Sequence, residues 1–178
     1  MATTLSDTPA PGWRPNMRLW GIFGLLAGGS IFYSAISSWR DDHVFLINAT
    51  QSLPNWAFII HRGQVPARGD YVFFDPPPHP LVKRHFGPEP HMFGKIVYGV
   101  PGDVVTHRGA YVLINGKTVA HMKPLTRFGE RLTPGATGAV PQGCYYAGTP
   151  HKDGFDSRYA EIGFVCAKQI IGTGEPIL

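Results

Sequence analysis

Residues 19–39 form an apolar stretch that contains no charged side chain. As an α-helix, such a stretch would be roughly 30 Å long, which is enough to cross the hydrocarbon core of a bilayer. Trp20, Tyr33 and Trp39 lie toward its ends, where aromatic residues collect in membrane proteins. The sequence therefore predicts a transmembrane anchor over residues 17–39, followed by a single folded body over residues 40–178.

The charges around this stretch predict its orientation. Arg14 and Arg18 precede it, whereas Arg40 is followed at once by two aspartates, so the positive side lies at the N-terminus. Positive flanks stay in the cytoplasm, which places the body on the far side of the membrane. Residues 1–16 are rich in proline and small polar residues and predict a disordered cytoplasmic tail.

A cleaved signal peptide is the competing interpretation of the same segment. Ala35 and Ser37 have the small-residue spacing of a cleavage site. The long N-terminal tail and an apolar run that exceeds the ~7–15 residues of a typical signal peptide favour the anchor.

The remaining sequence predicts a mainly β fold of antiparallel strands. The chain has 22 glycines and 17 prolines without a repeat period, and these separate short runs of β-branched and aromatic residues. Asn115 and Gly116 are typical of a two-residue hairpin turn. Residues 75–91 carry six prolines and predict an irregular excursion. Strands are expected at residues 44–47, 56–61, 71–74, 95–100, 104–106, 111–114, 118–121, 144–147 and 164–171.

Several function classes find no support in the sequence. The formal charge is +4, but the basic residues are scattered and form no stripe for nucleic acid. The eight histidines lack the spacing of a metal site, and no cofactor is implied. Cys144 and Cys166 form no CxxC motif, so they are either two buried thiols or one disulfide bridge.

Two residues outside the anchor are candidates for chemistry. Ser52 precedes Pro54 in a short polar stretch that predicts a stiff, exposed turn. Lys95 lies among Phe93, Ile96 and Val97, which are apolar enough to lower a lysine pKa. Taken singly, a serine near a proline is usually part of a turn, and a lone lysine in a strand is usually solvated.

Together with three further motifs, these residues resemble the membrane-bound signal peptidases of family S26, which use a Ser-Lys dyad. The matching segments, in family order, are Thr50-Gln-Ser52, Arg68-Gly-Asp70, Lys95 through Asp103, and Gly148 through Arg158. The resemblance covers about residues 45–178 and implies the signal-peptidase type of β body.

Within that family, the chain is most similar to the TraF-type peptidases of conjugative transfer systems. Residues 48–54 and 155–159 match the form of that branch. General signal peptidases have a serine where Gly154 stands and an arginine where Ile96 stands. The resemblance implies a protein of the bacterial inner membrane with a periplasmic body. Its substrate would be a pilin-like precursor of a type IV secretion system, and some members join the ends of the pilin into a ring.

The chemistry of the dyad assigns roles to these residues. A neutral Lys95 would take the proton of Ser52, whose alkoxide would attack the scissile carbonyl. The Ser52 backbone N–H and, by resemblance, the Thr50 hydroxyl would bind the oxyanion. Asp156 matches an aspartate that the conjugative branch is thought to use, although an ion pair with Arg158 is the simpler interpretation.

Other residues of the motifs have supporting roles. Asp70 and Asp103 are expected to cap turns. Two alternatives to a pilin-processing peptidase remain: a general type I signal peptidase, and a non-catalytic membrane-anchored component of a pilus machine that keeps the fold without the reaction. The oligomeric state, the cleavage site and the choice between hydrolysis and cyclisation are not encoded in any motif.

Overall fold

The computed structural model describes residues 16–48 and 52–177, so the expected tail over residues 1–16 lies outside the described residues except for Asn16. The first unit, Met1–Arg40, contains most of α1 (Met17–Asp42). This helix has 26 residues, buries none of them, and is long and apolar enough to cross a membrane. It continues through Asp42, three residues past the predicted end of the anchor.

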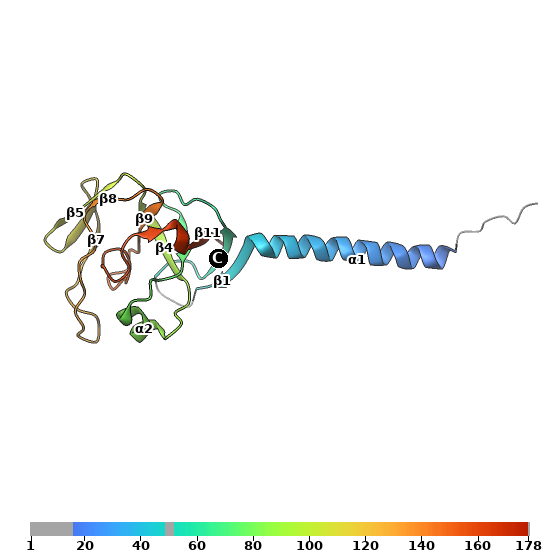
Figure 1. Ribbon diagram of the computed structural model, residues 1–178, viewed down its shortest axis with the longest axis horizontal. Helices are drawn as coiled ribbons and strands as arrows, with labels where there is room; N and C mark the ends of the chain where they lie inside the picture. Colours follow the sequence, from blue (N-terminus) through green and yellow to red (C-terminus); the bar gives the residue numbers. More distant parts are fainter. Residues whose placement is uncertain (1–15, 49–51, 178) are drawn as a thin grey trace, which may run out of the picture. The chain divides into compact units, whose positions relative to one another are not determined.

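The second unit, Asp41–Leu178, is built on two antiparallel sheets, which confirms the mainly β prediction. The larger sheet has the strand order β1-β2-β11-β3-β4-β9-β10, and the smaller has the order β7-β6-β5-β8. In Figure 1 the labelled strands β5, β7 and β8 of the small sheet lie together at one side of this unit. The large-sheet strands are β1 (His43–Ile47), β2 (Ala57–Arg62), β3 (Tyr71–Phe74), β4 (Phe93–Gly99), β9 (Cys144–Gly148), β10 (Val165–Cys166) and β11 (Ile170–Pro176).

The small sheet contains β5 (Val104–Arg108), β6 (Tyr111–Ile114), β7 (Lys117–His121) and β8 (Gly138–Ala139). Strands β6 and β7 are joined at Asn115 and Gly116, whose φ angles are 49° and 79°. Positive φ at both central residues is the geometry of a type I′ turn, so the predicted hairpin is confirmed.

The prediction of an irregular excursion over residues 75–91 is wrong in part, because it contains α2 (Pro80–Phe86). Pro80 stands in the first turn, where its missing N–H is not needed, and the His79 side chain accepts a hydrogen bond from the Leu81 N–H. Val82 is fully buried against the large sheet. The helix ends at Gly87, which has a φ of 94°.

The prediction of one last strand over residues 164–171 is also wrong. The chain forms β10, then a 3-10 turn (Ala167–Gln169), then β11, which inserts between β2 and β3. A Cβ at Gly174 would lie 2.2 Å from Phe73 Cε2, and one at Gly172 would lie 2.1 Å from the His61 carbonyl oxygen. These glycines permit the close approach, whereas in sequence they are typical of a turn.

Cys144 and Cys166 form a disulfide between directly paired residues of β9 and β10. Of the two alternatives that the sequence left open, the bridge is therefore the one found. It closes the base of the segment that carries Thr149, Asp156 and Arg158.

Candidate active site

The loop that carries Ser52 is held by Asn48, at the end of β1. The Asn48 side-chain amide donates hydrogen bonds to the carbonyl oxygens of Asn55, at 2.9 Å, and Leu53, at 3.3 Å. The Asn48 backbone N–H donates to the Trp56 carbonyl at 2.7 Å. Leu53 is buried in the core, so the chain that directly follows the half-buried Ser52 is held in place.

A second contact ties this loop to the far end of the chain. The Thr149 hydroxyl, just after β9, donates a hydrogen bond to the Ser52 carbonyl oxygen. The Thr149 backbone N–H donates to Asp156 Oδ2 at 3.0 Å. Thr149 therefore connects the Ser52 loop to the segment of residues 149–158.

Lys95 lies on β4, one of the central strands of the large sheet, and only 4% of its surface is exposed. Strand β4 alternates buried and half-buried residues, so Lys95 shares its face with Phe93 and Val97. Its Nζ lies 5.5 Å from the centre of the Phe93 ring. Ile96 points to the other face, where it packs with a different core cluster, so the expectation that Ile96 surrounds the lysine is wrong.

Burial lowers the pKa of Lys95 to about 8 from its ordinary value of 10.5. The charge of Asp156 opposes this change and the charge of Arg158 adds to it. At pH 7 a lysine with this pKa is neutral in about one molecule in ten, far more often than an ordinary lysine, and the neutral amine is the state that a general base requires.

Ser52 and Lys95 line one cavity of about 360 Å³. The cavity is mainly apolar, and its walls come from the end of β1, the Ser52 loop, α2 and the start of β4. Its other lining residues are Leu46, Ile47, Asn48, Leu53, Phe73, Phe86, His91, Met92, Phe93 and Gly94. The two residues that sequence reasoning paired, 43 positions apart, thus lie in the wall of the same cavity.

Asp156 and Arg158 form a buried ion pair beside this cavity and do not line it. Asp156 is 0% and Arg158 is 2% exposed. Arg158 Nε donates to Asp156 Oδ1 at 2.8 Å and Nη2 donates to Oδ2 at 2.9 Å. Arg158 Nη2 also donates to the Thr149 carbonyl at 2.7 Å. This bidentate geometry gives Asp156 the contacts of a structural partner that fixes Thr149.

The position of Gly154 is crowded by the same residues. A Cβ at this position would lie 2.2 Å from Thr149 Cγ2 and 2.8 Å from both Asp156 Oδ2 and Arg158 Nη2. A serine side chain therefore has no room here unless the Asp156–Arg158 pair shifts.

Asp70 and Asp103 lie outside the cavity and hold turns. The Asp70 carboxylate accepts a hydrogen bond from the Ala67 N–H at 2.8 Å. Asp103 accepts from the Val100 N–H at 2.7 Å and pairs with Arg68 at 2.5 Å. Burial raises the Asp103 pKa, but the hydrogen bonds from Val100, Asn115 and Arg68 outweigh it, so the pKa lies below its usual value.

Thr50, the expected second oxyanion donor, lies outside the described residues. Two residues that position Ser52 were missed from sequence. Asn48 was noted only as part of a motif, although an asparagine at a strand end is a common loop anchor. Thr149 carries no local signal, because its partner is 97 positions away.

Comparison with known proteins identifies the family. A family model described as signal peptidase, peptidase S26, matches residues 17–178. The chain belongs to the signal peptidase family. Members of this family are serine endopeptidases that process exported precursor proteins.

The comparisons with solved structures and with curated proteins add little to this family assignment. The solved structure of a signal peptidase I from Enterococcus faecalis is 23% identical, with a TM-score of 0.37, and the match covers 62% of this chain and 97% of that chain. The comparison with curated proteins found no match to this chain. Its membership therefore rests on the family model.

Proposed function

We propose that this signal peptidase family member cleaves exported precursors with a dyad of Ser52 and Lys95. The observation that carries the proposal is that one apolar cavity is lined both by a half-buried serine and by a buried lysine whose pKa is lowered to about 8. A serine hydroxyl needs a base, and a lysine can be that base only when it is neutral.

In the proposed reaction, neutral Lys95 removes the hydroxyl proton of Ser52 as the oxygen attacks the scissile carbonyl. The tetrahedral intermediate collapses to a Ser52 ester, and the Lys95 ammonium returns the proton to the departing amine. Water then attacks the ester carbonyl and gives a proton to Lys95; the Lys95 ammonium passes that proton to Ser52 Oγ as the ester bond breaks, and the product leaves with a new carboxyl group. An amine from the same chain in place of water would give a cyclic product.

The fixed Ser52 loop serves this reaction, because its backbone N–H is the proposed oxyanion donor. One such donor contributes roughly 3–4 kcal/mol to transition-state stabilisation. Thr149 binds the Ser52 carbonyl and Asn48 binds the carbonyls of Leu53 and Asn55, and these contacts hold the donor in a preorganised position. Thr50 remains the proposed second donor.

For the substrate we propose a pilin-like precursor of a conjugative transfer system, processed on the periplasmic side of the inner membrane. The crowding at Gly154 supports this branch, because the serine of general signal peptidases would collide with Thr149. The anchor would be α1, with its N-terminus in the cytoplasm.

The test is mass spectrometry of candidate pilin precursors incubated with the full chain in membranes. The wild type should release a shortened or cyclic product, and Ser52→Ala and Lys95→Met should each abolish it, alone as completely as together. Ser34→Ala in α1 and Lys168→Met in the 3-10 turn change residues of the same types that do not line the cavity, and both variants should process normally. Normal processing by Lys95→Met would exclude the dyad, and cleavage of leader peptides with no action on pilins would favour the general signal peptidase.

A further inference from the structure

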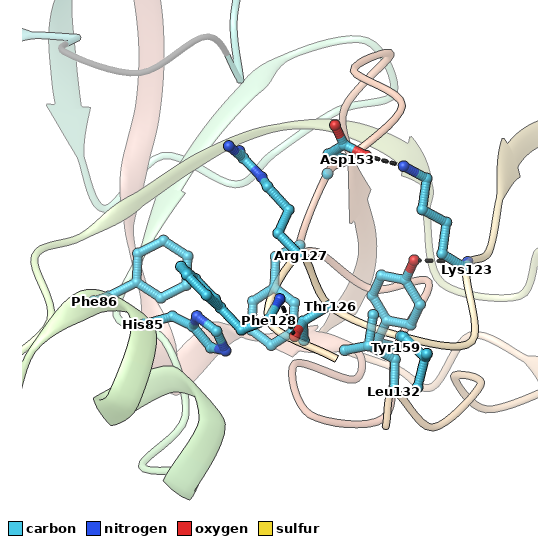
Figure 2. Close-up of a pocket in the computed structure, with 12 residues that line it drawn as sticks. His85, Phe86, Lys123, Thr126, Arg127, Phe128, Leu132, Asp153 and Tyr159 are labelled. Carbon is cyan, nitrogen blue, oxygen red and sulfur yellow. Dashed lines mark hydrogen bonds and ion pairs between the residues drawn. The ribbon is translucent and has the colours of Figure 1, made fainter. Parts of the chain in front are cut away.

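A second cavity, of about 340 Å³, adjoins the one that contains Ser52 and Lys95, and Phe86 lines both. Figure 2 shows this second cavity, with Phe86 and His85 at the end of α2 on one side and Lys123, Asp153 and Tyr159 on the other. The mechanism above uses none of its polar side chains.

Aromatic rings connect the two cavities. Phe93, in the wall of the first, lies 4.7 Å from Phe86, measured between ring centres. Phe86 lies 5.9 Å from Phe155, which lies 6.1 Å from Tyr159 in the wall of the second. A peptide that occupies the first cavity can therefore continue along this row of rings into the second.

Large apolar side chains around the second cavity are exposed to solvent. Phe128 is 80% exposed, Leu125 is 46% exposed and Phe86 is 43% exposed. The His85 ring stacks on Phe128 at 5.2 Å. Neighbouring exposed aromatic and aliphatic side chains around a cavity are typical of a surface that binds a partner's apolar residue.

Positive charge exceeds negative charge around this cavity. Arg84 and His85 share one carboxylate, Glu130, and Lys123 pairs with Asp153. In the part of the chain that the structure describes, no carboxylate lies within ion-pair distance of Arg127. Figure 2 shows Arg127 extended between Phe86 and the Asp153–Lys123 pair.

The titration of Asp153 is consistent with this excess. The hydrogen bond from Lys123 lowers the pKa of Asp153, and the charges of Lys152 and Arg127 lower it further. The cavity thus combines an apolar floor with a guanidinium that is free to bind a carboxylate.

We propose that the second cavity is a substrate subsite for a segment in which an aromatic or large aliphatic residue is flanked by Asp or Glu. The apolar residue packs on Phe86 and Phe128, and the carboxylate pairs with Arg127. This inference rests on the proposed peptidase function, since the occupant is part of the precursor that reaches Ser52. The subsite selects precursors by residues away from the scissile bond.

The test measures peptide binding to the full-length Ser52→Ala protein in detergent, by fluorescence anisotropy. Three labelled peptides carry Glu-Phe-Glu, Lys-Phe-Lys or Glu-Ala-Glu between Gly-Ser flanks. The Glu-Phe-Glu peptide should bind at least about tenfold more tightly than either of the others. Arg127→Glu should reverse the preference between Glu-Phe-Glu and Lys-Phe-Lys, and Phe128→Ala should weaken Glu-Phe-Glu binding about tenfold.

Arg131→Glu is the matched control, because Arg131 is exposed on the same segment but does not line the cavity. It should leave the peptide preference unchanged. Equal binding of the three peptides, or the same loss in Arg131→Glu as in Arg127→Glu, would overturn the subsite. Binding needs no cleavage, so failure of the peptidase function is detected separately, in the precursor assay.

Discussion

At the scale of single residues, the feature that matters most is a lysine, Lys95, whose side chain is buried among apolar groups. Lys95 is 4% exposed, and no hydrogen bond to its Nζ is found within residues 16–48 and 52–177. Burying an ammonium in this way costs stability, because the charged form loses its hydration. The same loss of hydration favours the neutral amine, which is the form that can accept a proton from a serine.

The stability of the protein should therefore depend on pH through Lys95. Its folded pKa of about 8 lies below the unfolded value of 10.5, so between these values only the unfolded chain holds the proton. The free energy of unfolding should rise by roughly 3 kcal/mol across that window, and the penalty is complete below pH 8. Lys95→Met should be more stable than the wild type at pH 7 and show no such rise.

Urea denaturation of the full chain in detergent at several pH values checks this expectation. Lys168→Met, which removes an exposed lysine, is the control. A Lys95→Met variant that keeps the wild-type rise between pH 8 and 10.5 would show that another group causes it.

A serine at Gly154 should damage the site. The added Cβ would collide with Thr149 and with both members of the Asp156–Arg158 pair, so Gly154→Ser should displace the contact that fixes the Ser52 carbonyl. We expect a loss of activity of roughly 100-fold, since misplacement of about 1 Å has that effect. Peptide turnover measures it, with Gly28→Ser in α1, where an added Cβ meets nothing within 4 Å and φ is not positive, as the control for an added hydroxymethyl group. Wild-type turnover by Gly154→Ser would mean that the segment adapts without moving Thr149.

At the scale of elements, strand β4, which carries the proposed base Lys95, is supported by a disulfide one strand away. Strand β9 pairs with β4 on one side and, through Cys144, is bonded to β10 on the other. The two cysteines are 22 positions apart, a loop whose closure stabilises the folded state by roughly 3 kcal/mol.

Reduction of the Cys144–Cys166 disulfide should therefore lower the free energy of unfolding by about 3 kcal/mol and make residues 145–165 less ordered. Chemical denaturation with and without reductant measures the change. The double variant Cys144→Ala with Cys166→Ala should have the same free energy of unfolding as the reduced protein, and the reductant should not change that value. Equal stability of oxidised and reduced wild type would show that the bridge has no structural effect.

Elements differ in how far the sequence could predict them. Strands with β-branched and aromatic residues, such as β3, were predicted to the residue, because that composition favours a half-buried pleated surface. Helix α2 was missed since proline was interpreted as a breaker, although it is favoured in a first turn. Strand β11 was cut short because Gly172 and Gly174 resemble a turn, and only the neighbouring Phe73 and His61 explain them.

At the scale of the whole molecule, the site depends on contacts between distant parts of the sequence. The order of the motifs predicted that Ser52 and Lys95 act together, and the structure shows that both line one cavity. The contact between Thr149 and Ser52 could not be predicted, because it spans 97 positions and has no local pattern. The disulfide was undecided for the same reason: two cysteines without a motif pair only when the strands that carry them are known to be neighbours.

The dependence of kcat/KM on pH for a short peptide substrate tests the dyad most directly. Deprotonation of Lys95 should activate the enzyme, so the rate should rise with pH and level off with an inflection near pH 8. Val97→Asp, on the same face of β4, should move the inflection to higher pH, because a nearby carboxylate favours the ammonium; should that buried position not tolerate the change, the wild-type profile alone decides. An inflection near pH 10, the value of a solvated lysine, would contradict Lys95 as the general base.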